Sequence, residues 1–159
     1  MDWLKIYEAL TRGSEDKRVL RDLGFISKED FVRLGDEAMN KCIEMGLKAK
    51  RKSDDRIKNN LMVERDMVLE IAILSYQQAG SERKLDEIGQ LALKRSVMFD
   101  GAEQVELALK AYGLPKDKIG LKKLASKALD KNLPSVAIAL YKQAGDYASA
   151  RRLKTFYSS

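Results

Sequence analysis

The residue types that most often carry catalysis are scarce in this chain. It contains no histidine and one cysteine, Cys42, so it lacks the commonest general base and the ligands of a usual zinc site. Cys42 stands among apolar residues at helical spacing, which predicts a buried, unreactive thiol rather than a nucleophile. Neither a Gly-x-x-x-x-Gly-Lys phosphate loop nor a Gly-x-Gly-x-x-Gly segment occurs in the sequence.

Neighbouring carboxylates are the remaining candidates for acid–base chemistry. Asp54-Asp55 and Asp86-Glu87 are adjacent in sequence, but successive residues of a helix point about 100° apart. We therefore interpret them as helix caps and solvated positions. The sequence predicts a protein without catalytic, metal-binding or cofactor-binding residues, and an enzyme that uses carboxylates alone is the alternative.

Positive charge is the chemistry that the chain does carry. The net charge of the whole chain is +6, with +4 contributed by residues 47–58 and +7 by residues 116–159. Such clusters attract phosphate backbones or acidic protein surfaces, and a solvated helix face is the plainer interpretation. The candidate partner-binding residues are Lys48, Lys50, Arg51, Lys52, Lys116, Lys118, Lys122, Lys123, Lys127, Arg151, Arg152 and Lys154.

Apolar residues recur at helical spacing through nearly the whole chain, and no segment keeps up the alternation of a strand. The sequence therefore predicts a single all-α domain over residues 1–159, with about 8–10 helices. Residues 1–26 are expected to form capping helices, and residues 28–157 about four antiparallel helix pairs. Ser14 is expected to cap a short early helix, and Asp100-Gly101 to interrupt a later one.

Several helix ends carry local signals. Ser27 followed by Asp30 resembles a capping box, and Asp146 is expected to cap the last helix. The helix that opens after Ser81 is expected to point four apolar residues inward. These residues are Leu85, Ile88, Leu91 and Ala92.

Two segments, Ala72–Gly80 and Ala137–Gly145, repeat the pattern Ala-Ile-x-x-Tyr-x-Gln-Ala-Gly. Weaker copies begin at Ala38 and Ala108, so the leading alanines are 34, 36 and 29 residues apart. Helix–turn–helix repeats have a period of about 34 residues. In such a unit the alanine lets a neighbouring helix approach, the tyrosine fills the wider gap, and the glycine ends the helix with a positive φ.

The second copy continues into a segment, Ala139–Ala150, that resembles the centre of a tetratricopeptide repeat. The matching turn and second-helix positions hold Gly145, Asp146, Tyr147 and Ala150. One extra residue, Ala144, makes the segment similar to the looser repeats of coatomer- and clathrin-type α-solenoids. Most copies lack the early Trp and Leu-Gly of the tetratricopeptide pattern and the proline after its second helix. The resemblance implies a superhelix of stacked helical hairpins that acts as a scaffold or adaptor.

The expected function is therefore a protein–protein interaction module whose partner is another protein or a peptide, with an acidic surface favoured. The alternative is an RNA-associated or other nucleic-acid-associated protein that binds through its basic C-terminal region, and a homodimer is also possible.

One cysteine favours a reducing compartment, and the first residues lack the layout of a signal peptide. Since no apolar run approaches the ~18–20 residues of a membrane span, a cytoplasmic protein is expected.

Overall fold

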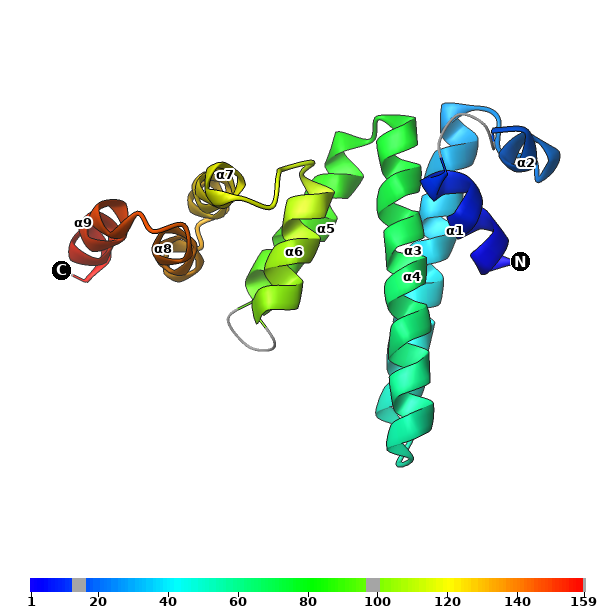
Figure 1. Ribbon diagram of the computed structural model, residues 1–159, viewed down its shortest axis with the longest axis horizontal. Helices are drawn as coiled ribbons and strands as arrows, with labels where there is room; N and C mark the ends of the chain where they lie inside the picture. Colours follow the sequence, from blue (N-terminus) through cyan, green and yellow to red (C-terminus); the bar gives the residue numbers. More distant parts are fainter. Residues whose placement is uncertain (13–16, 97–100, 159) are drawn as a thin grey trace. The chain divides into compact units, whose positions relative to one another are not determined.

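The computed structural model describes residues 1–12, 17–96 and 101–158, and within these ranges the chain forms helices and no strand. This confirms the predicted all-α class and the expected number of helices (Figure 1). The helices are α1 (Trp3–Thr11), α2 (Lys17–Asp22), α3 (Lys28–Lys50), α4 (Asp55–Ala79), α5 (Glu82–Arg95), α6 (Gly101–Ala111), α7 (Lys118–Asp130), α8 (Pro134–Gln143) and α9 (Tyr147–Tyr157). The expected cap at Ser14 and the expected break at Asp100 lie outside the described residues.

The helices group into two compact units, Met1–Glu82 and Arg83–Ser159. We call them the first and the second unit and describe each by itself. The organisation of the whole chain as one domain stays a prediction.

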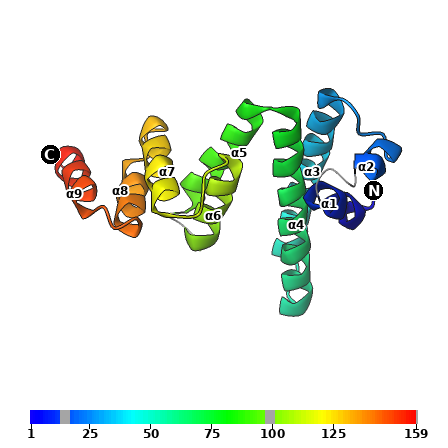
Figure 2. The ribbon, with the colours of Figure 1, turned by 45° about the horizontal axis from the view of Figure 1, so that its top comes forward.

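The first unit is built on a long antiparallel hairpin of α3 and α4, which have 23 and 25 residues (Figure 2). The buried residues of the two helices include Ala38 on α3 and Ala72 on α4. Helix α1 packs against α4, where the Tyr7 hydroxyl donates to Glu70 at 3.1 Å. Helix α2 in turn contacts α1.

The predicted capping box at the start of α3 is confirmed. The Asp30 backbone N–H donates to the Ser27 hydroxyl at 3.1 Å, and the Ser27 N–H donates to the Asp30 carboxylate at 2.9 Å. At the start of α4 the side chain of Asp54 accepts from the backbone of Arg56 at 2.9 Å. These carboxylates satisfy N–H groups that have no partner within their own helix.

The second unit has one core to which α5, α6, α7 and α8 all contribute. Its buried members are Ala92, Leu93, Val105, Ala108, Leu109, Leu124, Ala125, Ala128, Val136, Ala137 and Leu140. Helix α9 contacts α8 and buries Ala150, while Leu153 packs partly against the core. The expectation that Leu91 points inward is wrong, because its side chain is 44% exposed. The buried stripe of α5 follows Ile88, Gly89, Ala92 and Leu93, which leaves Leu91 outside the stripe.

The two clearest copies of the repeated segment have the predicted local structure. The leading alanines Ala72 and Ala137 are fully buried, as are those of the weaker copies. Each segment ends at a glycine with positive φ, 66° at Gly80 and 79° at Gly145. Equivalent pairs of backbone hydrogen bonds form the turn at each glycine. They satisfy carbonyl groups at the end of the helix that have no partner within it.

The four alanines do not occupy equivalent places in the order of helices. Ala72, Ala108 and Ala137 lie on α4, α6 and α8, so each of these steps crosses two helices. Ala38 lies on α3, the hairpin partner of α4, and the step to Ala72 crosses only one. The 34-residue spacing of this first step arises because α3 and α4 are long.

Two tyrosines lie directly on glycines of a neighbouring helix. The Tyr76 ring covers Gly35 of α3, and its hydroxyl donates to Asp36 at 2.6 Å. The Tyr112 ring covers Gly89 of α5, and its hydroxyl donates to Asp86 at 2.8 Å. A Cβ atom at either glycine would overlap the ring. The hydroxyl bonds hold both rings against the glycine backbone.

The substitution Gly35→Ala should therefore destabilise the protein, although alanine is the better helix former. We expect a net loss of about 1–3 kcal/mol in the free energy of unfolding, as for overpacked cores, measured by urea denaturation. The loss should shrink when Gly35→Ala is combined with Tyr76→Leu, because the ring is then absent.

Gly46→Ala is the matched control on the same helix. A Cβ atom there would meet only the Arg65 side chain, at 4.0 Å. We expect this change to be neutral or to stabilise by about 0.5–1 kcal/mol, the usual gain from replacing a helical glycine. Equal effects at Gly35 and Gly46 would contradict the proposed packing of Tyr76.

Candidate interaction surface

All twelve candidate partner-binding residues are exposed. They divide between the two units. Four of them, Lys48, Lys50, Arg51 and Lys52, belong to the first unit, and the remaining eight belong to the second. Within each unit, some of these cations pair with another described residue and others do not.

The four cations of the first unit lie where α3 ends and the chain turns into α4. Lys48 pairs with Glu44 one turn earlier, at 2.9 Å, and its hydrogen bond holds the pKa of that carboxyl below its usual value. Lys50, Arg51 and Lys52 form no ion pair with any described residue. Cations at this position also interact favourably with the carbonyl end of the helix.

Four of the eight candidates in the second unit have partners within the fold, and one of them is Arg152, which donates to the Ser149 hydroxyl at 3.1 Å. Lys116 pairs with Glu106 at 3.4 Å, and Lys122 lies 3.9 Å from Asp146. The ammonium of Lys127 lies 5.3 Å from the centre of the Tyr112 ring, within the range of a cation–π contact. These residues contribute to the structure as well as to the charge of the surface.

Lys131 belongs to the same group of partnered cations. Its ammonium donates to Asp86 at 2.6 Å, on the carboxylate that also accepts from Tyr112. The bond from Lys131 is the main reason why the pKa of Asp86 lies below its ordinary value, and burial is the main reason why the pKa of Tyr112 is raised. The cluster ties α5 to the ends of α6 and α7.

The few acidic residues near the C-terminus are largely occupied by helix capping. Asp117 accepts from the Gly120 N–H at 2.8 Å at the start of α7, and Asp146 accepts from Ser149 at the start of α9. The bond from the Ser149 hydroxyl is the main cause of the lowered pKa of Asp146. Four candidate cations of this region form neither an ion pair nor a side-chain hydrogen bond with a described residue: Lys118, Lys123, Arg151 and Lys154.

The exposed aromatic residues of the described chain all lie on α9. They are Tyr147, Phe156 and Tyr157, with 60%, 72% and 47% of their surface exposed. In the sequence, Phe156 and Tyr157 closely follow the basic residues Arg151, Arg152 and Lys154. Tyr147 instead matches a position of the tetratricopeptide resemblance, where packing is expected. Arg151, one helical turn after Tyr147, is the signal that could have marked this tyrosine as part of the surface.

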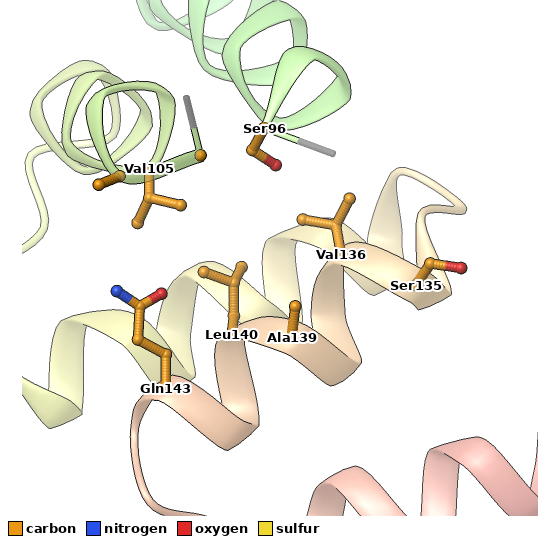
Figure 3. Close-up of a pocket in the computed structure, with 9 residues that line it drawn as sticks. Ser96, Val105, Ser135, Val136, Ala139, Leu140 and Gln143 are labelled. Atoms are coloured by element: carbon orange, nitrogen blue, oxygen red, sulfur yellow. The ribbon is translucent and has the colours of Figure 1, made fainter. Parts of the chain in front are cut away.

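Apart from this surface, the second unit has a pocket of about 320 Å³ between the start of α6 and α8 (Figure 3). Val105 of α6 faces Val136 and Leu140 of α8 across it, and Gln143 lies at its edge. None of the described residues that line it is ionisable, so none of them provides a group for acid–base chemistry.

Cys42 is buried in the α3–α4 seam, as predicted. Its thiol lies 3.5 Å from the backbone oxygen of Arg65, and burial raises its pKa to about 12. A thiol with this pKa forms little thiolate near neutral pH. Across the described ranges, no three His, Cys, Asp or Glu side chains gather closely enough to hold a metal ion.

Comparison of the chain with family models, known proteins and solved structures finds no match. In the described part of the chain, none of the helices has the length and apolar character that crossing a bilayer requires. The arrangement of charges and aromatic residues in the second unit is thus the main structural guide to function.

The partnered cluster predicts a specific dependence on pH. A carboxyl whose folded pKa is lowered stabilises the fold above its ordinary pKa of 3.8, and this contribution disappears as the pH falls through the folded value. Asp86→Asn should lower the free energy of unfolding at neutral pH by about 1 kcal/mol, a modest figure because the side chain is partly exposed. The difference in the free energy of unfolding between Asp86→Asn and the wild type should narrow as the pH falls below 3.8.

Glu87→Gln is the neighbouring control, since the partner of Glu87 among the described residues is the highly exposed Arg83. Urea denaturation of both variants over a pH series provides the comparison. A deficit for Asp86→Asn that stays constant with pH, or that matches the effect of Glu87→Gln, would refute the role assigned to the cluster.

Proposed function

We propose that the protein is a non-enzymatic scaffold that binds an acidic surface of another protein or peptide through its second unit. One observation carries this proposal. The exposed cations of residues 116–158 greatly outnumber the acidic residues, and two of the three acids cap helices. Uncompensated positive charge on packed helices increases the rate of encounter with an acidic partner and orients it.

The architecture supports the same proposal. Short connections join α7 to α8 and α8 to α9, and small residues at the seams let these helices pack closely. A superhelix of stacked hairpins, as the tetratricopeptide resemblance implies, would offer an extended surface for a peptide or a helix. The proposed setting is the cytoplasm, where a single buried cysteine stays reduced.

RNA binding is the second candidate, and the aromatic residues of α9 favour it. Exposed rings interspersed with arginines can stack on unpaired bases while the cations neutralise phosphates. Tyr147, Phe156 and Arg151 provide both kinds of group within one helix. The two candidates differ in whether nuclease treatment removes the bound material.

Affinity purification from an extract of the source cells, with and without nuclease, tests the proposal. The test variant reverses the four candidate cations of the second unit that form neither an ion pair nor a side-chain hydrogen bond with a described residue: Lys118→Glu, Lys123→Glu, Arg151→Glu and Lys154→Glu. The matched control makes four equivalent changes in the first unit: Lys50→Glu, Arg51→Glu, Lys52→Glu and Lys58→Glu. All eight residues are exposed, so both variants should remain folded.

A defined set of proteins should be retained by the wild type and by the control, should resist nuclease, and should be lost from the test variant. Capture that depends on nucleic acid would favour the second candidate instead. Equal retention by both variants would overturn the proposed role of the second unit.

A further inference from the structure

Helix α9 has a face whose composition suits one kind of partner. The helix and the residue after it, Tyr147–Ser158, contain no acidic side chain. Arg151, Arg152 and Lys154 are all exposed on it. Asp146 precedes the helix, but its carboxylate accepts from Ser149 and lies close to Lys122. Arg152 donates to the Ser149 hydroxyl at 3.1 Å and keeps an exposed guanidinium. The charge of this helix is therefore almost entirely positive.

Helical spacing separates the inner and outer sides of α9. Ala150 is buried, and Leu153, three residues later, packs partly against the core of the second unit. Ala148, Arg152 and Thr155 recur at intervals of four and three residues on the opposite side, and all three are exposed. Tyr147 and Phe156 lie on the two flanks of this outer side.

Small residues at the centre of the outer side favour a helix over a nucleic acid. Ala148 and Thr155 can neither neutralise a phosphate nor stack on a base, but they let another helix approach closely. The second unit already uses this arrangement at its own seams, where Ala137 of α8 is fully buried. An incoming helix would lie between Arg151 and Arg152, with Tyr147 and Phe156 at its sides.

We propose that the outer side of α9 binds an acidic, amphipathic helix of a partner protein. Tyrosine, phenylalanine and arginine are enriched at protein interfaces, where aromatic residues act as anchors and arginine forms bidentate pairs with carboxylates. Acidic side chains on the incoming helix would pair with Arg151 and Arg152, and its apolar side chains would contact Tyr147 and Phe156. This inference depends on the proposed scaffold function and assigns its site.

Charge argues against a second copy of the chain as the occupant. In a two-fold dimer the same patch meets itself. The arginines of one α9 would then face those of the other, and neither helix has an acidic residue that could pair with them. Like charges brought together in this way oppose association.

A displayed library of helical peptides, selected on the whole protein, tests the proposal directly. The selection is counter-screened against the variant Arg151→Glu/Arg152→Glu. The enriched peptides should carry Asp or Glu on both edges of a stripe of apolar residues at i, i+3, i+4 and i+7 spacing. A single-stranded oligouridylate is measured in parallel by fluorescence anisotropy over a salt series.

Binding of an enriched peptide should weaken by about tenfold or more in Arg151→Glu/Arg152→Glu, since two charge pairs become repulsive. Phe156→Ala should also weaken it, by several-fold. The controls Lys50→Glu/Lys52→Glu and Ile43→Ala change the same kinds of exposed residue in the first unit. They should leave the affinity unchanged.

Three results would overturn the inference: no enrichment of acidic amphipathic sequences, equal affinity for a scrambled peptide of the same composition, or tighter and α9-dependent binding of the oligouridylate. The scaffold function is separable from these results. Nuclease-resistant capture that is lost when Lys118 and Lys123 are reversed, but kept when Arg151 and Arg152 are reversed, would retain the scaffold and discard α9 as its site.

Discussion

Close approach of helices at positions without a bulky side chain underlies the structure of both units. Gly35 and Gly89 leave room for a tyrosine ring to lie directly on the helix backbone, and alanines serve the same purpose along the other seams. Close packing of this kind tolerates little change in volume, so the positions of the small residues determine which helix faces meet. Polar and charged residues, which would be costly to bury without partners, are thereby placed on the remaining faces.

The use of carboxylates at helix starts links this packing to the charge of the surface. A helix needs partners for its first N–H groups, and Asp117 and Asp146 supply them in the second unit. A carboxylate aimed at a backbone N–H is less available to a lysine on another helix. Asp86, by contrast, does pair with a lysine outside its own helix. It binds Lys131 and Tyr112 and so ties three helices together. The positive surface is thus a consequence of how the acids are used.

Local features could be predicted from the sequence because their partners are close in the chain. The capping box at Ser27, the positive φ of Gly80 and Gly145 and the burial of Ala72 all depend on residues within one or two helical turns or on simple periodicity. The pairing of Lys131 with Asp86 spans 45 residues and could not be predicted. The repeat spacing did not predict the order of helices, for a different reason. The step from α3 to α4 crosses one helix, but these helices are long and reproduce the spacing of a two-helix repeat.

The tyrosines explain why residue type alone did not separate core from surface. Tyr76 lies on a glycine of the neighbouring helix and is buried, and Tyr112 repeats the contact at the end of α6. Tyr147 covers none of the described glycines, and the residue is 60% exposed. A tyrosine therefore occupies the core at two places where a neighbouring helix has a glycine, whereas Tyr147 lies on the surface. On α9 the tyrosine lies beside arginines, where an apolar ring and a cation together suit a partner that is both apolar and acidic.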